Sequence, residues 1–435
     1  MKWSVNAGVV DTMWAMVEEL FPIHRTLVND GIRNSLELIR SSLDIAIHEF
    51  PSGMHVWDWI IPEAWNVNQA YIADLSGRKL VDFRNNNLHL AAYSCPFQGR
   101  LTKAELLEHI WTLPDQPDAI PYRTLYYKEN QWRFCLAHDE LSLFNDDDQY
   151  EVCIDVDLRP GKLCVGEFVL PGKTDKEIWL TSYLCHPSLA NDNLSGVALA
   201  VSVMKTLASM PDRQYSYRLL LWPESIGATT YLASHEQILE KVVGGYVFTC
   251  CGDAGPITYK KSYFGNTLID QAALHALRYA DRGNYSIRDF WLNGSDEQKF
   301  NAPGVRLPFG SFMRTPYSEF PEYHTSKDNL SFISKDQLAE ILSVVLKALF
   351  IADTNRIYEP LYKGEPFLSK HGLHRQVDLK RPDRKSLAYI QRVLTMETDG
   401  HNSLLDIANK WDYHFDDILD ESIIFSQAGL FKALN

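Results

Sequence analysis

The sequence predicts an α/β protein with a mostly β insert and a small helical module at its C-terminal end. From about Leu158 to residue 353, apolar strand-like runs alternate with helix-like stretches, which is typical of a sheet with parallel strands. Residues 53–157 instead hold short runs rich in β-branched and aromatic residues. The last 50 or so residues have helical apolar spacing.

Residues 10–49 carry apolar positions at helical spacing on both sides of the "NDG" break at 29–31, so we expect two helices there. In the insert we expect one helix near 102–111 and strands that are separated by turns such as Ser76-Gly77. The expected strands of the insert are 56–62, 70–75, 79–83, 89–94, 122–127, 132–138 and 150–156.

The α/β part continues with an ordered series of elements up to residue 353. We expect strands at 162–170, 177–184, 217–223, 244–250 and 305–312, and helices at 194–209, 228–242, 268–280 and 334–352. The Pro- and Gly-bearing segment 358–376 resembles a linker. The expected domains are a discontinuous α/β domain (1–52 and 158–360), the insert (53–157) and the C-terminal module (361–435).

The composition is that of a soluble globular protein, with 46% hydrophobic and 23% charged residues in 435. The net charge of -14 opposes binding to nucleic acid, because phosphates are neutralised by an excess of Lys and Arg. Seven cysteines form no CxxC pair and are expected to be reduced core thiols. No basic leader and no window of about 18 apolar residues is present, so we expect a cytoplasmic protein without a membrane segment.

Polar residues follow the predicted strands at the edge where α/β sheets bind ligands. His186 ends the strand in "EIWLTSYLC", Glu224 follows "YRLLLWP", and Asp253 follows "GGYVFTCCG". Asp192 lies in the loop after the first of these strands, and His324 follows the strand-like 305–312. Four runs of sequence therefore deliver these polar side chains to one edge of the predicted sheet.

Imidazole and carboxylate are the usual ligands of catalytic zinc, which keeps three protein ligands and an open position. His186, Asp192 and His324 fit that role. A separate carboxylate must take a proton from water during attack on a carbonyl, and Glu224 is the candidate general base. Each residue also has a structural interpretation, and spacing alone leaves both open. These alternatives are a hydrogen-bonded His186, a helix cap by Asp192 with Asn191, an ion pair of Glu224 with Arg213 or Arg218, and a bond from His324 to Asp328.

Several stretches resemble bacterial proteins with an aminopeptidase-like domain, which are often described alongside polysaccharide biosynthesis. These proteins fall within the zinc aminopeptidase and glutaminyl cyclase superfamily. The resemblance covers nearly the whole chain. The matching stretches are "EELFPIHRTLVNDGIR", "TLPDQPDAIPYRTLYYKENQWRFCLAH", "GEFVLPG", "CHPSLANDNLSG", "WPESIG", "GSDEQKF", "RTPYSEFPEYHTSKDN" and the C-terminal module.

The resemblance implies a phosphorylase/hydrolase-like mixed sheet flanked by helices, a β-rich insertion and a winged-helix-like tail. It also implies that His186, Asp192 and His324 match metal ligands and that Glu224 matches the general base. Ser225 stands where members with two metals carry a second acidic residue, which favours one zinc ion over two. Pro187-Ser188 replaces the usual x-Asp after the ligand histidine, so another residue must orient His186.

Three further residues are candidates for substrate binding. Asp253 is the one carboxylate near the end of "YVFTCCGD", where it would be an extra ligand or a substrate contact. Asp296 in "GSDEQ" resembles an acidic residue that lies near substrate in the superfamily, with Glu297 as its structural neighbour. The guanidinium of Arg314 could clamp a carboxylate, or equally pair with Glu319 or Glu322.

The tail has the apolar spacing of a helix-turn-helix, but its second helix carries acidic residues where a DNA reader needs basic or amide side chains. Residues 401–435 contain two basic and six acidic side chains, so we expect a packing or protein-interaction module.

Three functions remain open. The first is a zinc hydrolase of an amide bond, acting on a peptide or a small N-acyl substrate. The second is a mononuclear-zinc acyl transferase or cyclase, and the third is a metal-stabilised scaffold without catalysis. The retained Glu224 favours catalysis, and the net charge and exposed insert are compatible with a homo-oligomer.

Overall fold

The computed structural model describes residues 8–128, 130–146, 148–210, 212–280, 283–375 and 383–434. The chain forms two compact units. The larger unit comprises Ser4–Gly265 and Asn284–Ser343, and the C-terminal unit comprises Asn266–Gly283 and Val344–Asn435. The expected β insert is therefore part of the larger unit, and the boundary between the units falls within one long helix, α8 (Lys335–Thr354).

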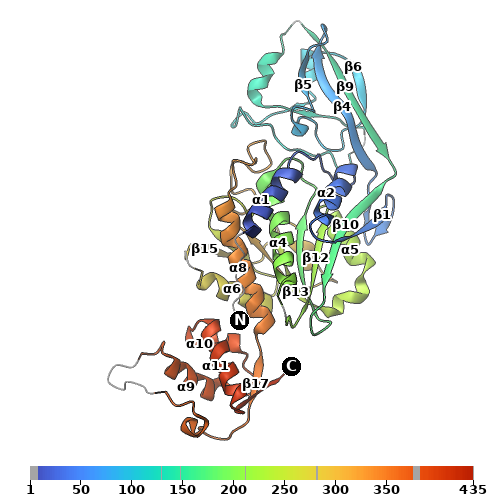
Figure 1. The fold of residues 1–435 in the computed structure, drawn as a ribbon. Coiled ribbons are helices and arrows are strands. Elements are labelled where there is room, and N and C mark those ends of the chain that lie inside the picture. The colour runs from blue at the N-terminus through green and yellow to red at the C-terminus, as the bar shows by residue number, and fades with distance from the viewer. Residues whose placement is uncertain are drawn as a thin grey trace. The chain divides into compact units, whose positions relative to one another are not determined.

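The larger unit is built around an eight-stranded mixed sheet of order β1-β10-β12-β11-β13-β16-β14-β15 (Figure 1). Strands β12, β11, β13 and β16 run parallel, whereas β1, β10 and β14 each pair antiparallel to a neighbour. Strand β15 pairs parallel to β14 at the edge. The strands are β1 (Ala46–Pro51), β10 (Lys162–Leu170), β11 (Glu177–Tyr183), β12 (Ser216–Trp222), β13 (Val242–Phe248), β14 (Ile257–Lys260), β15 (Tyr285–Arg288) and β16 (Phe309–Met313).

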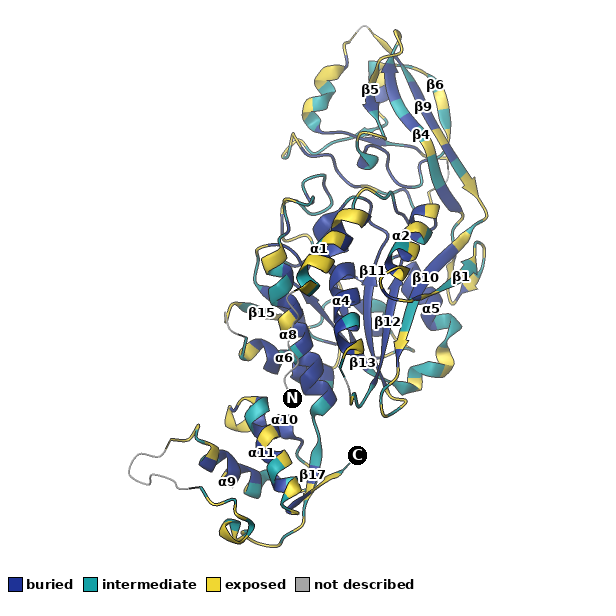
Figure 2. Ribbon diagram, in the orientation of Figure 1, coloured by how far each residue is buried: buried dark blue, intermediate teal, exposed yellow. Residues whose placement is uncertain are grey.

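The centre of this sheet is buried on both faces. Every residue of β11 and β12 is buried, which Figure 2 shows as continuous dark strands. Strands covered on both faces are expected to be mostly apolar, and the polar exceptions here include Glu177 and Arg218, which pair with each other. Helix α4 (Gly196–Ala208) packs on β11, β12 and β13, α1 (Gly8–Leu20) packs on α4, and both α2 (Asp30–Arg40) and α5 (Ile226–Ser234) contact β10. A short helix, α7 (Glu297–Phe300), contacts β16.

The insert contains a four-stranded antiparallel sheet of order β5-β4-β9-β6. Its own hydrophobic core includes the fully buried Trp65, Ile72 and Phe134. The remaining pairs are the hairpin of β2 and β3 and the short pair of β7 and β8. The elements are β2 (His55–Val56), β3 (Trp59–Ile60), β4 (Ala64–Asp74), β5 (Lys79–Asp82), β6 (Phe97–Thr102), α3 (Lys103–Leu107), β7 (Ile110–Trp111), β8 (Phe134–Cys135) and β9 (Gln149–Arg159).

The C-terminal unit combines helices with a two-stranded sheet. Helix α10 begins at a capping box in which Ser403 and Asp406 bond reciprocally, and it ends at Asp412 in the left-handed conformation. Strands β17 and β18 pair antiparallel. The elements are α6 (Leu268–Arg278), the end of α8, β17 (Ile357–Pro360), α9 (Leu387–Glu397), α10 (Leu404–Trp411), α11 (Phe415–Gln427) and β18 (Phe431–Leu434).

Five of the predicted segments are wrong in their type or extent. The second of the two helices expected within residues 10–49 ends at Arg40, and the end of that stretch forms an edge strand, 46–51, that pairs with β10. The strands expected at 89–94 and 122–127 form only isolated bridges, such as Ala92 to Thr124. The helix expected at 228–242 is α5 followed by a 3-10 helix at Glu236–Lys241. The expected linker 358–376 begins with β17, and its last residue lies outside the described residues.

All seven cysteines are free, and six of them are buried, as expected of core thiols. None of the helices in the described part of the chain has the length and apolar character needed to cross a membrane. The first seven residues, on which the expected lack of a leader partly rests, lie outside the described residues.

Candidate metal centre

His186 follows β11 at the carboxyl edge of the sheet and is held through its own backbone. The fully buried Arg25 donates from Nη2 to the carbonyl of His186 at 2.8 Å. The other Nη of Arg25 donates to the carbonyls of Leu20 and Ile23. This buried guanidinium therefore ties the end of α1 to the turn that carries His186.

Asp192 lies in the buried turn between β11 and α4, and another carboxylate fixes that turn. The two carboxylate oxygens of Asp328 accept hydrogen bonds from the backbone N–H groups of Asn191 and Asp192, at 2.6 and 2.9 Å. Tyr183 donates its hydroxyl to Asp192 Oδ1 at 2.5 Å. These bonds aim the second oxygen, Oδ2, toward the two histidines.

His324 is held by the insert. The backbone N–H of Tyr122 donates to the carbonyl of His324 at 2.7 Å, and Ser326 N–H donates to the carbonyl of Ile120 at 2.8 Å. The ring of Tyr122 lies with its centroid 5.1 Å from the rings of both His186 and His324. The insert segment 120–122 therefore runs beside one predicted ligand and contacts a second.

The structure brings His186, Asp192 and His324 together. One ligand atom of each lies within 4.8 Å of those of the other two. Asp192 Oδ2 is 3.1 Å from His324 Nε2 and 3.8 Å from His186 Nε2. Ligand atoms at about 2.0–2.1 Å from a tetrahedral zinc lie about 3.3 Å from one another, so these separations suit one such ion.

The hydrogen bonding of the three residues also fits a metal. Asp192 Oδ2 and His324 Nε2 are buried and have no hydrogen-bond partner of acceptable geometry among the described residues. Buried polar atoms are rarely left without a partner. A cation coordinated between them would satisfy both atoms, and the donor set of two imidazoles and one carboxylate is one that zinc accepts.

The protonation states favour coordination as well. Burial lowers the pKa of His186 to about 4, although Asp192 works against the shift. Burial tends to raise the pKa of Asp192, but His186, His324 and the Tyr183 hydroxyl outweigh it and lower that pKa to about 2. Neutral imidazole and ionised carboxylate, the forms that bind metal, are therefore the forms present near neutral pH.

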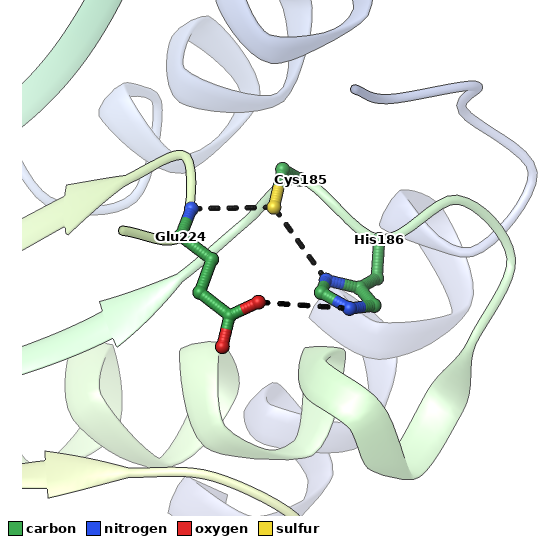
Figure 3. Close-up of side chains that lie close together, drawn as sticks. All are labelled: Cys185, His186 and Glu224. Atoms are coloured by element: carbon green, nitrogen blue, oxygen red, sulfur yellow. Dashed lines mark hydrogen bonds and ion pairs between the residues drawn. The ribbon is translucent and has the colours of Figure 1, made fainter. Parts of the chain in front are cut away.

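Glu224 faces the same centre from the end of β12 (Figure 3). Its Oε1 accepts a hydrogen bond from the Ser295 hydroxyl at 2.8 Å, whereas Oε2 lies 3.9 Å from His186 Nε2. Burial, together with the negative charges of Asp296 and Asp192, raises the pKa of Glu224 well above its usual range. One oxygen is thus anchored while the other is available as a proton acceptor, in surroundings that favour the protonated form.

Asp296 supports the turn that carries Glu224. It is fully buried and accepts hydrogen bonds from Trp222 Nε1 and from the backbone N–H of Ser225, each at 2.7 Å. Burial raises its pKa to about 6. Ser225 has a φ of 63°, and such left-handed conformations in a residue other than glycine cost about 1–3 kcal/mol. Asp296 therefore holds a strained turn next to Glu224.

Cys185 is a contributor that sequence analysis missed. Its Sγ accepts a hydrogen bond from the Glu224 N–H at 3.2 Å and lies 3.5 Å from His186 Nδ1 (Figure 3). Burial raises the pKa of this thiol well above its usual range. Because His186 turns Nε2 toward Asp192 and Glu224, the thiol lies beside the other ring nitrogen, where it can orient the ring.

The other two predicted substrate contacts lie outside this cluster. Asp253 accepts hydrogen bonds from Asn191 Nδ2 at 3.0 Å and from the Thr315 hydroxyl at 2.5 Å. Arg314 is buried and pairs with Glu340 at 3.2 Å, not with Glu319 or Glu322 as the sequence suggested. Their roles in substrate binding stay predictions, and the contacts that they make are internal to the fold.

The residues that the sequence offered as structural partners of Glu224 and His324 bind other groups in the structure. Arg218 pairs with Glu167 and Glu177, and Arg213 donates to the carbonyls of Leu207 and Pro171. Asp328 bonds the backbone of 191–192. Glu224 and His324 therefore lack the ion pair and the hydrogen bond that would have explained them as purely structural residues.

A cavity of about 380 Å³ opens onto the centre. Its lining includes Cys185, His186, Glu224 and His324, so the general-base candidate and two predicted ligands face one space. Four aromatic side chains of the insert complete the wall, namely Trp59, Tyr122, Tyr126 and Tyr127. The insert is thus part of the site.

Comparison with known proteins agrees with this fold. A Clostridium acetobutylicum protein is 42% identical over 404 residues, covering 93% of this chain and 92% of that protein. Its provisional name is polysaccharide biosynthesis protein with aminopeptidase-like domain.

Two solved structures are also similar. One, provisionally named a peptidase and also from Clostridium acetobutylicum, has a TM-score of 0.91 at 38% identity and covers 98% of each chain. The other is BSAP, a zinc aminopeptidase from Bacillus subtilis, with a TM-score of 0.58 at 14% identity, covering 79% of this chain and 95% of that one. The second likeness concerns the fold alone.

The expected fold class and resemblance are confirmed: the chain has an aminopeptidase-like α/β fold and a winged-helix domain. Residues 356–433 match a winged helix-turn-helix family model. Residues 14–355 match the family model described as "Domain of unknown function (DUF4910)", and the chain belongs to that family.

Proposed function

We propose that the protein is a zinc-dependent hydrolase of amide bonds, with His186, Asp192 and His324 as the ligands of one zinc ion. The observation that carries the proposal is the meeting of three ligand atoms beside Glu224 Oε2. Two of these atoms are buried and have no hydrogen-bond partner among the described residues. The fold shared with a zinc aminopeptidase supports the same metal.

A zinc ion bound there would act as a Lewis acid toward an amide carbonyl and would lower the pKa of water. Glu224 Oε2 takes the proton from the attacking water, and the raised pKa of this carboxyl suits it for holding that proton. Glu224 then returns the proton to the leaving amine. Ser295 keeps the other carboxylate oxygen in place throughout.

One zinc ion per chain is the expected count. Ser225 replaces a second acidic ligand after Glu224, and Asp253 is held by Asn191 and Thr315. The free thiols support a reducing compartment, and we place the protein in the cytoplasm.

The C-terminal unit is proposed to serve packing or protein contacts and not nucleic acid. In α11, Asp416 pairs with Lys347 and Glu421 pairs with Arg375, so two of its acidic side chains stabilise the unit itself.

Replacing the general base tests the proposed function. We expect Glu224→Gln to bind zinc as the wild type does but to lose about 10²- to 10⁴-fold in kcat, because the amide cannot accept the proton. Zinc is counted by elemental analysis, and turnover is measured on aminoacyl and N-acyl p-nitroanilides. Glu37→Gln, at an exposed position of α2, is the matched control and should keep full activity. A fully active Glu224→Gln, or a zinc-loaded wild type that cleaves none of these amides, would refute the proposal.

A further inference from the structure

The cavity at the metal centre has an aromatic wall and very little charge. Its lining, all of it in the described part of the chain, includes a single carboxylate, that of Glu224, and no lysine or arginine. The rings of Trp59 and Tyr127 are the most open members of the wall, at 37% and 59% exposure. A group that enters the cavity therefore meets ring faces and hydroxyls on most sides.

The other carboxylates near the centre are already engaged. Asp192 binds the Tyr183 hydroxyl with one oxygen and faces the two histidines with the other. Asp296 uses both oxygens, on Trp222 and Ser225. Among the described residues that line the cavity, an ammonium group beside the scissile bond would find no carboxylate other than that of the general base.

The fixed cations near the cavity are also unsuited to receiving a charged group. Arg25 is buried behind His186 and donates to backbone carbonyls. Lys299 Nζ stands 5.1 Å from the centroid of the Trp59 ring, so a fixed positive charge beside that ring repels an ammonium. Burying an unpaired charge is costly, whereas an amide can be accommodated by hydroxyl groups.

The metal centre itself offers no excess of negative charge. Asp192 and Glu224 together carry at most two negative charges, and one divalent cation neutralises both. The centre then has no excess of negative charge with which to attract an ammonium group.

A second cavity, of about 530 Å³, lies on another side of His324. It is lined by Arg123 and Glu319, but neither His186 nor Glu224 belongs to its lining, and Glu319 pairs with Arg288 at 3.0 Å. The charged side chains of this second cavity, Arg123 and Glu319, therefore do not line the cavity that holds the general base.

Resting on the proposed hydrolase function, we infer that the substrate is an N-acylated compound that carries no charge next to its scissile amide and lies against the aromatic wall of the insert. Hydrogen bonds hold the tyrosine side chains of this wall in place. The Tyr127 hydroxyl donates to the carbonyl of Ile60 at 3.2 Å, and the hydroxyls of Tyr122, Tyr126 and Thr26 form a chain at 3.2 and 3.3 Å. These bonds fix the rings, so that an apolar or ring-shaped group packs on their faces at little entropic cost.

The reaction consumes one water per amide. The carbonyl carbon gains an oxygen from water and loses the amine nitrogen, giving one carboxylate and one ammonium product. One water proton passes through Glu224 to the departing amine. The second ionises from the new carboxyl group and protonates the amine to ammonium, and no oxidant, reductant or further reactant is needed.

Three matched p-nitroanilides test the charge preference on the zinc-loaded protein. Leucine p-nitroanilide has an ammonium group beside the scissile carbonyl, N-acetylleucine p-nitroanilide has a neutral amide there, and 4-methylpentanoyl p-nitroanilide lacks the amino group. We expect kcat/KM to be at least about tenfold higher for both neutral compounds, because the ammonium must be desolvated without a partner. Equal rates, or a preference for the free amine, would overturn the inference.

Variants of the wall test where the substrate lies. We expect Trp59→Ala and Tyr127→Ala each to raise KM for the preferred neutral compound about three- to tenfold with little change in kcat. Both side chains are substantially exposed, so the fold should tolerate their loss. The matched controls are Trp57→Ala and Tyr263→Ala, which remove rings of similar exposure that do not line this cavity. An unchanged KM in both wall variants would contradict the assigned wall.

Binding of the uncleaved compounds separates this inference from the proposed function. Titration of zinc-loaded Glu224→Gln with 4-methylpentanamide and with leucinamide should favour the neutral amide, and Trp59→Ala in the same background should remove the difference. If the wild type cleaves no probe but this preference holds, the hydrolase is wrong and the neutral site stands. If the wild type cleaves only free-amine substrates, the hydrolase stands and the neutral site is wrong. Binding of neither amide would also overturn the inference.

Discussion

A single sulfur atom lies between the general-base candidate and a predicted metal ligand. Cys185 Sγ accepts the backbone N–H of Glu224 and contacts His186 Nδ1. Metal-bound histidines usually donate their second ring nitrogen to a carboxylate or carbonyl, and here a neutral thiol has that place. The thiol fixes the ring without adding another negative charge to a centre that already holds Asp192 and Glu224.

Removing this thiol should weaken zinc binding. We expect Cys185→Ala to raise the Kd for zinc about 10- to 100-fold, and Cys185→Ser to raise it less because a hydroxyl can still accept from His186. Competition with a chromogenic chelator measures both values. Cys164→Ala, at a buried cysteine in β10, is the control for loss of a core thiol.

Wild-type affinity in Cys185→Ala would contradict the orienting role. A sulfur-to-metal charge-transfer band in the cobalt-substituted wild type would also contradict the orienting role, because it would show that Cys185 binds the metal directly.

Sequence analysis could place His186, Asp192, Glu224 and His324 because each follows a predicted strand at the edge where α/β sheets bind ligands. It could not identify Cys185 or Ser295, although both stand next to residues that it singled out. Their roles depend on which way a side chain turns at the end of a strand or in a loop, and this is decided by contacts with distant segments. Tyr122 was missed for the same reason.

Two loops at the sheet edge, the turn at 190–192 and the loop that carries His324, are bonded to each other and together form part of the site. The segment that follows His324 returns Asp328 to the turn at 190–192, where its two oxygens accept backbone N–H groups. The predicted ligand His324 and Asp328, which holds the backbone of the predicted ligand Asp192, are thus only four residues apart in the chain.

Replacing Asp328 should disturb the metal centre without creating a cavity in the hydrophobic core. In Asp328→Asn one acceptor becomes an N–H donor that faces a backbone N–H, which should cost about 1–3 kcal/mol of stability. We expect a lower Tm and weaker zinc binding, measured by calorimetry and chelator competition. Asp336→Asn, at an exposed position of α8, should change neither. An unaltered Tm and zinc affinity in Asp328→Asn would show that the loop does not need this carboxylate.

His275 links helices within the C-terminal unit. Its Nε2 accepts the backbone N–H of Phe415 at 3.1 Å, so Nδ1 carries the proton and donates to Asn409 Oδ1 at 2.8 Å. Burial lowers the pKa of His275 from 6.5 to about 4. A protonated ring would lose the acceptor that Phe415 uses.

The unit should consequently lose stability in acid. The unfolded chain takes up the His275 proton below about pH 6.5 while the folded chain resists until about pH 4, so stability falls as the pH drops through this window. The loss from His275 alone is about 2 kcal/mol at about pH 5. Denaturant unfolding followed at pH 7.5 and 5 should show a smaller pH difference in His275→Gln than in the wild type or in the exposed control His401→Gln. An identical pH difference in all three would contradict this account.

The expected central strands and most helices are present because their apolar patterns agree with burial in the sheet. The errors lie where tertiary contacts override local pattern. Residues 46–51 pair with β10 in spite of helical spacing upstream, and 122–127 has the composition of a strand but lies against the His324 loop and the cavity. The structures of these two segments depend on contacts with distant residues, so the sequence of each segment alone does not predict them.

At the scale of the molecule, the insert completes the site of the α/β part. It supplies the aromatic wall and, through segment 120–122, holds the backbone of His324. Composition revealed an insert and a helical C-terminal module, but nothing in the sequence of the insert indicated that it reaches the metal centre. Such long-range placement follows from the assembled fold and not from periodicity.

Anomalous diffraction at the zinc absorption edge, on crystals of the zinc-loaded protein, tests the central claim most directly. We expect one strong peak per chain, within about 2.3 Å of His186 Nε2, Asp192 Oδ2 and His324 Nε2, and no such peak in His324→Ala. A peak elsewhere, or none at these three atoms, would contradict the metal centre on which the proposed function depends.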